Sequence, residues 1–130
     1  MSTFKTVVRV LFAAFFIFAG INHFTNRNFF IAIVPPYLPR PAALVYISGA
    51  AEILLGALLL VRGTTRIAGW GLIALLIAVF PANLHMALNP SRYPAISRAA
   101  LWIRLPLQGV LIALAYWYTR PPDRAAPAAD

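Results

Sequence analysis

Cysteine is absent from this chain of 130 residues, and acidic residues are scarce, with three Asp and Glu against 11 Lys and Arg. Without cysteine the chain can form no disulfide and no thiolate metal site, and it cannot relay thiols by itself. Charged residues make up only 11% of the sequence and hydrophobic residues 62%. A soluble domain would have too little polar surface to cover so many apolar side chains. The composition therefore favours a membrane protein.

Charge is missing altogether from three long stretches, residues 10–26, 67–91 and 105–119. About 20 apolar residues cross the hydrocarbon core of a bilayer as a helix. The second stretch, with 25 residues, is long enough to cross by itself. The apolar runs predict an all-α fold, an integral membrane antiparallel four-helix bundle. Its predicted spans cover about residues 6–24, 42–61, 67–88 and 99–119.

The segments outside these spans are short or rich in proline. Four prolines between residues 35 and 41 interrupt regular helix, so we predict an interfacial loop over 25–41, whose apolar piece 29–34 is too short to span. The Pro/Ala-rich tail, 121–130, is expected to be disordered. A basic start before an apolar run is also typical of a cleaved signal peptide. No A-x-A type site closes the run, which favours its retention.

The basic residues lie mostly at the ends of the predicted spans, where they contact anionic headgroups. No nucleic-acid-binding motif accompanies them, so the expected partner is the lipid bilayer and not a nucleic acid. With four spans both termini share one side. Six basic residues on that side against four on the other favour cytoplasmic termini by the positive-inside rule. The six are Lys5, Arg9, Arg62, Arg66, Arg120 and Arg124, and the four are Arg27, Arg40, Arg92 and Arg98.

Polar residues of the predicted spans gather toward the opposite membrane face. Antiparallel crossing brings the end of the first span, the start of the second, the end of the third and the start of the fourth to that face. We therefore predict one polar ligand-binding pocket there. No catalytic motif and no metal-binding motif is recognisable, and the sequence leaves open whether the chain is an enzyme. The seven pocket candidates are Asn22, His23, Glu52, Asn83, His85, Arg104 and Gln108.

Glu52 is the most informative of these residues, because an acid at the centre of a membrane helix costs about 2.5 to 3.5 kcal/mol on insertion scales. An ion pair with Arg104 would lower the cost of burying either group. Alternatively, Arg104 snorkels to the membrane surface and Glu52 is protonated. Arg104 shares a helix face with Gln108, four residues on, which favours an inward polar stripe. Both interpretations are compatible with the sequence.

The remaining candidates allow a similar comparison. Asn83 and His85 point about 200° apart around a helix, so we expect only Asn83, which follows Pro81, to be central. His23 could carry a proton or bind a metal as an axial ligand, but a single histidine at a helix end is more often a hydrogen-bonded interface residue. Ser48, Gly49, Glu52 and Gly56 recur at steps of three and four residues. Small residues so spaced allow close approach of a neighbouring helix.

Five stretches follow one another along the chain, four on the predicted spans and one in the interfacial loop: Ala19-Gly-Ile-Asn-His-Phe24, Pro35-Pro-Tyr-Leu-Pro39, Ser48-Gly-Ala-Ala-Glu-Ile-Leu-Leu-Gly56, Phe80-Pro-Ala-Asn83 and Arg104-Leu-Pro-Leu-Gln108. In their residues and their order they resemble the DoxX family of small bacterial membrane proteins. The resemblance implies a four-helix bundle in the bacterial inner membrane, with relatives linked to quinone-coupled sulfur oxidation and to membrane redox or oxidative-stress complexes. Some relatives handle thiols, which this chain cannot do alone because it has no cysteine.

A quinone held between helices is the functional hypothesis that fits these residues best, because apolar walls suit its ring and tail and a few polar groups suit its carbonyls. In this hypothesis Arg104 and Asn83 hold a carbonyl oxygen, and Glu52 or His23 exchanges protons. A redox membrane protein or a second copy of the chain would be the protein partner. The alternatives are a non-catalytic assembly subunit and a small transporter or channel. Residues 54–60 and 73–79 lack polar side chains, which counts against a transport path.

Overall fold

The structure, a computed structural model, describes residues 2–94 and 96–120, and the tail predicted to be disordered, 121–130, lies outside them. Over the described residues the chain forms α-helices and short 3₁₀-helices, with no strand. Four of the helices are long and apolar enough to cross a membrane. They are α1 (Thr3–Thr25), α3 (Pro41–Leu59), α4 (Thr65–Leu88) and α5 (Arg98–Thr119). The predicted all-α four-helix membrane fold is therefore confirmed.

Hydroxyl side chains fix several of the helix ends. Ser2 caps α1 by accepting from the backbone N–H of Lys5 at 3.1 Å, and Ser97 caps α5 by accepting from Ala100 at 3.1 Å. The second span was predicted to run to Val61 but ends at Leu59, and the 3₁₀-helix η1 (Arg62–Thr64) follows. Thr64 donates to the carbonyl of Leu58 at 2.7 Å, and Thr65 donates to that of Leu59 at 3.1 Å. These bonds satisfy carbonyls left free at the end of α3.

The predicted loop over residues 25–41 contains a helix of seven residues, α2 (Arg27–Ile33), which the sequence analysis did not foresee. The four prolines all follow this helix and so do not interrupt it. Ile33 is buried in a cluster with Met86, Ala87, Tyr93 and Leu101 from the end of α4, the following loop and the start of α5. Tertiary packing rather than local propensity therefore stabilises α2.

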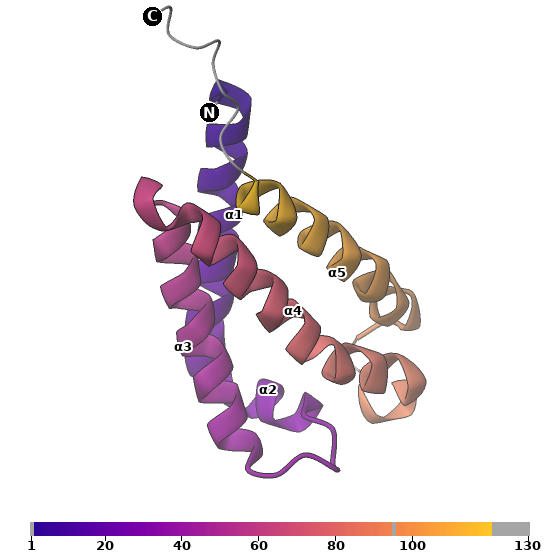
Figure 1. Ribbon diagram of the computed structural model, residues 1–130. Coiled ribbons are helices and arrows are strands. Elements are labelled where there is room, and N and C mark those ends of the chain that lie inside the picture. The colour runs from indigo at the N-terminus through magenta and orange to yellow at the C-terminus, as the bar shows by residue number, and fades with distance from the viewer. Residues whose placement is uncertain (1, 95, 121–130) are drawn as a thin grey trace, which may run out of the picture.

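The spanning helices are arranged in two antiparallel pairs (Figure 1). α1 lies beside α3, and α5 lies beside α4, while α3 and α4 contact each other through the η1 turn and the segments next to it. The pairs converge at the η1 end and diverge toward the opposite end, where α2 lies between α3 and α4 (Figure 1). α3 and α5 therefore lie on different sides of α4.

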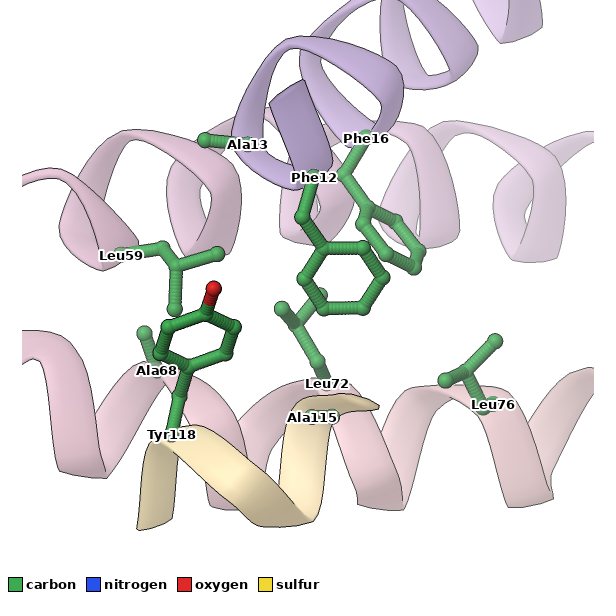
Figure 2. Close-up of a cluster of buried hydrophobic side chains, with 9 residues drawn as sticks. All are labelled: Phe12, Ala13, Phe16, Leu59, Ala68, Leu72, Leu76, Ala115 and Tyr118. Atoms are coloured by element: carbon green, nitrogen blue, oxygen red, sulfur yellow. The ribbon is translucent and has the colours of Figure 1, made fainter. Parts of the chain in front are cut away.

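A hydrophobic core joins all four spanning helices at the end where they converge (Figure 2). Phe12 and Phe16 of α1 point toward Leu72 of α4, with their rings edge to face at a centroid distance of 5.0 Å. Tyr118 of α5 stacks on Phe12 at 6.3 Å and donates to the backbone carbonyl of Lys5 at 2.7 Å. The first and last helices of the chain are thus joined at this end.

Glycines allow α1 and α3 to approach closely, as the spacing of small residues in α3 predicts. A Cβ atom on Gly20 would lie 2.6 Å from the carbonyl oxygen of Gly49, and one on Gly56 would lie 2.8 Å from the Ile17 side chain. Contacts below 3.0 Å cannot be accommodated unless something moves. The α1–α3 interface is therefore a close backbone contact of the kind that small residues permit in membranes.

Candidate functional site

The polar residues predicted to share one pocket fall into separate groups, and the most buried group lies between α1 and α3. His23, near the C-terminal end of α1, and Glu52, in the middle of α3, are each only 8% exposed. Nδ1 of His23 lies 3.5 Å from Oε2 of Glu52. Among the residues that the structure describes, this is the one contact within 4.0 Å between a basic side chain and an acidic one.

His23 is oriented by two further contacts. Its Nδ1 lies 2.7 Å from the carbonyl oxygen of Ala19, and its Nε2 lies 3.3 Å from the hydroxyl of Ser48. A carbonyl only accepts, so Nδ1 carries a hydrogen, and in the neutral ring Nε2 accepts from the Ser48 hydroxyl. If Nε2 gains a proton, Ser48 becomes the acceptor and the positive imidazolium lies beside Glu52. The His23–Glu52 cluster can therefore hold a proton on either residue.

Glu52 lacks part of the hydrogen bonding that a buried carboxyl group needs. Its Oε2 is buried and has no hydrogen-bond partner among the described residues, since Nδ1 of His23, 3.5 Å away, bonds instead to the carbonyl of Ala19 at 2.7 Å. An unsatisfied buried polar atom costs about 1 to 3 kcal/mol and is rare unless a bound molecule or a function accounts for it. In a membrane helix such an acid is by default a candidate for a functional site.

The walls of the His23–Glu52 cluster are glycine and aromatic residues. A Cβ atom on Gly49 would lie 2.7 Å from the Cβ atom of His23, so glycine at this position makes room for the imidazole. Phe30 of α2 stacks on the His23 ring with centroids 4.0 Å apart and planes 18° apart. Next to them, Phe24 and Tyr46 stack at 5.5 Å. On the side of α2 the imidazole is thus covered by the flat ring of Phe30.

A second polar group joins α4 to α5. Nδ2 of Asn83 donates to Oε1 of Gln108 at 2.6 Å, and Nε2 of Gln108 donates to the backbone carbonyl of Leu76 at 2.6 Å. Gln108 is only 4% exposed. Asn83 therefore faces the neighbouring helix, which agrees with the expectation that Asn83 and not His85 points inward. Its partner is Gln108, however, and not a residue of the His23–Glu52 cluster.

Of the two interpretations that the sequence left open for Glu52, the ion pair with Arg104 is not formed. Arg104 is half-buried and makes no hydrogen bond or ion pair with any described residue, whereas Glu52 contacts His23. Two features keep these residues apart. α3 and α5 lie on different sides of α4 (Figure 1). Glu52 also lies 11 residues into α3 and Arg104 six residues into α5, a difference of about 7 to 8 Å in depth.

Asn22 and His85 join neither polar group. Asn22 is exposed, and its side-chain oxygen accepts from the hydroxyl of Thr25 at 3.4 Å. Nδ1 of His85 lies 3.3 Å from the amide of Asn89, while its buried Nε2 has no partner among the described residues. The predicted pocket of seven residues is therefore wrong as a single site. A hollow on the outer face of α1 is lined by Phe15, Phe18, Ala19, Ile21, Asn22 and Thr25.

Sequence reasoning missed two residues of the site. Ser48 lies four residues before Glu52 and so shares its helix face, a signal that was used only for helix packing. Phe30 contacts His23 only because α2 folds back across the end of α1, and no local sequence pattern predicts that contact. Ser48 could have been assigned from its spacing, whereas Phe30 could not.

The fold and these buried groups together define a four-span helical membrane protein with one acid–imidazole cluster between α1 and α3. The chain belongs to the family described as Domain of unknown function (DUF8561), which matches residues 12–119. The match runs from α1 to the last residue of α5 and includes both polar groups. No curated protein and no solved structure matches the chain.

Proposed function

We propose that this protein is a DoxX-like component of a membrane redox or oxidative-stress system, and that it binds a quinone or a similar lipophilic molecule at the His23–Glu52 cluster. The observation that carries this proposal is the buried Oε2 of Glu52, which has no hydrogen-bond partner among the described residues. A ligand carbonyl would complete the hydrogen bonding of a protonated Glu52. Aromatic neighbours such as Phe30 would pack against a flat ring.

The residues present fit a quinone in their chemistry. A quinone takes up two electrons and two protons to become a quinol, and we assign the electrons to a partner redox protein. The chain's own part is to orient the carbonyl and to move a proton. His23 lies two residues before the end of α1, near the membrane surface, and Glu52 lies deeper. Ser48 and His23 therefore link Glu52 to the interface, from which a proton can be replaced.

The charge distribution supports an orientation for the proposed site. The η1 end of the described chain carries Lys5, Arg9, Arg62, Arg66 and Arg120, and we assign it to the cytoplasmic side of a bacterial inner membrane. His23 then lies near the opposite face. The proposed site would exchange protons with the non-cytoplasmic side. A reporter enzyme that works only in the cytoplasm should be active when it is fused to the N-terminus.

The test is a binding titration of the purified full chain with a short-chain benzoquinone in mild detergent, alongside mass spectrometry of the lipophilic molecules that copurify. Glu52→Gln and His23→Gln are expected to weaken quinone binding at least tenfold. Asn22→Ala is the matched control, since Asn22 is next to His23 in sequence but exposed, and this variant should bind as the wild type does. Absence of a copurified quinone together with equal affinities for all variants would rule out the proposal.

A second candidate is a non-catalytic assembly subunit, and the close packing at Gly20 and Gly49 favours it. In this alternative the contact between His23 and Glu52 only fixes the register of α1 on α3. Glu52→Gln would then lower the yield of folded protein, and what remained would show no altered quinone affinity. A normal yield with reduced affinity supports the ligand site instead, so one variant separates the two functions.

A further inference from the structure

Cations from α1 and α4 gather where α1 begins and α5 ends, far from the His23–Glu52 cluster. The ammonium of Lys5 lies 5.2 Å from the ring centroid of Trp117 and 5.6 Å from that of Tyr118. Nη1 of Arg9 donates to the hydroxyl of Thr65 at 3.3 Å. Lys5 and Arg9 lie one helical turn apart on α1 and both reach toward the last turn of α5 or the first of α4.

Arg66 of α4 completes this basic site, which we define as Lys5, Arg9 and Arg66. Its Nε donates to the backbone carbonyl of Thr119 at 2.9 Å, so it lies at the same turn of α5 that Lys5 contacts. Arg62 and Arg120 lie at the same end of the molecule. α1 and α4 thus place several positive charges around the C-terminal turn of α5.

Within residues 2–94 and 96–120, no acidic side chain lies at this end of the molecule to pair with these charges. Glu52 is the acid within the described residues, and it lies in the middle of α3 against His23. Asp123 and Asp130 belong to the tail, outside the described residues, as does Arg124. In the described part of the chain the basic site therefore has no acidic partner, and it is suited to an anion from another molecule.

The free donors and the aromatic surroundings indicate what that molecule is. A guanidinium has five N–H donors, yet Arg9 and Arg66 each use only one in the bonds above. Nε of Arg9 is buried and has no partner among the described residues. Arginine donors match the oxygens of a phosphate in pairs. Trp70, Tyr116, Trp117 and Tyr118 lie at this depth, as aromatic residues do at the headgroup level of a bilayer.

We propose that Lys5, Arg9 and Arg66 form a binding site for the phosphate of an anionic phospholipid. The lipid phosphate would lie at the end of α5 between α1 and α4, and its acyl chains would cover the adjacent exposed apolar side chains, among them Phe4, Val7 and Leu11. A headgroup phosphate is favoured over free phosphate because the aromatic residues place the site at the membrane surface. This site is independent of the proposed quinone site.

The test compares phosphatidylglycerol, phosphatidylcholine and inorganic phosphate as additives to the full chain in mild detergent. Phosphatidylglycerol is expected to raise the melting temperature by several degrees at saturation, and the other two are not. Raising the salt concentration should abolish this difference. Arg9→Gln and Arg66→Gln should each weaken phosphatidylglycerol binding about fivefold, as loss of one basic residue near a lipid surface implies. Arg27→Gln is the control, since Arg27 is exposed and lies in α2 at the other end.

Three results would overturn the proposal. Equal effects of the two lipids would show a general detergent or bilayer effect, and an equal effect of inorganic phosphate would show a site for the free anion. Unchanged affinity in both arginine variants would place the lipid elsewhere. Should these variants not fold, native mass spectrometry of the wild type in mixed micelles decides, because the site requires retained phosphatidylglycerol in preference to phosphatidylcholine.

Discussion

At the scale of single residues, the buried polar side chains differ in how completely they are hydrogen-bonded. His23 has a partner for each ring nitrogen, and Gln108 uses both ends of its amide. Glu52 keeps an oxygen without a hydrogen bond among the described residues. A hydrogen bond between membrane helices contributes about 0.6 kcal/mol on average and up to about 1.7 kcal/mol. Satisfied groups such as Gln108 therefore act in stability, and the unsatisfied Glu52 is the residue to examine for function.

Gln108→Leu should destabilise the protein by about 1 to 2 kcal/mol, because it removes the bonds to Asn83 and to the Leu76 carbonyl together. Asn83→Leu should have a smaller effect, since Gln108 then keeps its bond to Leu76. Thermal unfolding in a single detergent measures both. An Asn83→Leu variant less stable than Gln108→Leu would show that the contact with Leu76 contributes little.

At the scale of helices, the α1–α3 pair depends on the absence of side chains at its contact. A Cβ atom on Gly20 would meet the backbone oxygen of Gly49 at 2.6 Å, and backbone cannot move aside as a flexible side chain can. Gly109 of α5, by contrast, has nothing within 4 Å of a built Cβ atom. The two glycines share a residue type and a helical setting but differ in their surroundings, so they form a matched pair.

Gly20→Ala is expected to destabilise the protein by about 1 to 3 kcal/mol through overpacking. Gly109→Ala should stabilise it by up to about 1 kcal/mol, because alanine is the better helix former and meets no neighbour. Melting temperatures of the two variants against the wild type are sufficient to decide. Shifts in the same direction for both would mean that the α1–α3 backbone contact is looser than described.

The short helix α2 covers the His23–Glu52 cluster from the membrane surface. Phe30 stacks on His23, and the hydroxyl of Tyr93 donates to the carbonyl of Ala32 at 3.2 Å, which ties α2 to the loop after α4. Phe30→Ala should therefore raise several-fold the rate at which His23 is modified by a water-soluble reagent that attacks imidazole groups, as measured by mass spectrometry. His85 serves as the internal reference. An unchanged His23 rate would mean that α2 does not control access.

At the scale of the whole molecule, the sequence predicted the class of fold but not the grouping of its polar residues. Long apolar runs determine the four spans, because the bilayer imposes helix on any apolar segment long enough to cross. The depth of Glu52 and Arg104 could be estimated from their positions along their spans. The sequence did not allow a prediction of which helices are neighbours, since that depends on side-chain packing such as the contact of Tyr118 with Phe12. The helix α2 escaped prediction for the same reason.

The central claim is that His23 and Glu52 act as one unit in holding a lipophilic ligand. A double-mutant cycle tests it most directly, with the affinity for a short-chain benzoquinone measured for the wild type, His23→Gln, Glu52→Gln and the double variant. Residues in contact within one network couple by about 0.5 to 3 kcal/mol. We therefore predict that the double variant loses clearly less affinity than the two single losses combined. Strictly additive losses, or no loss in any variant, would contradict the account.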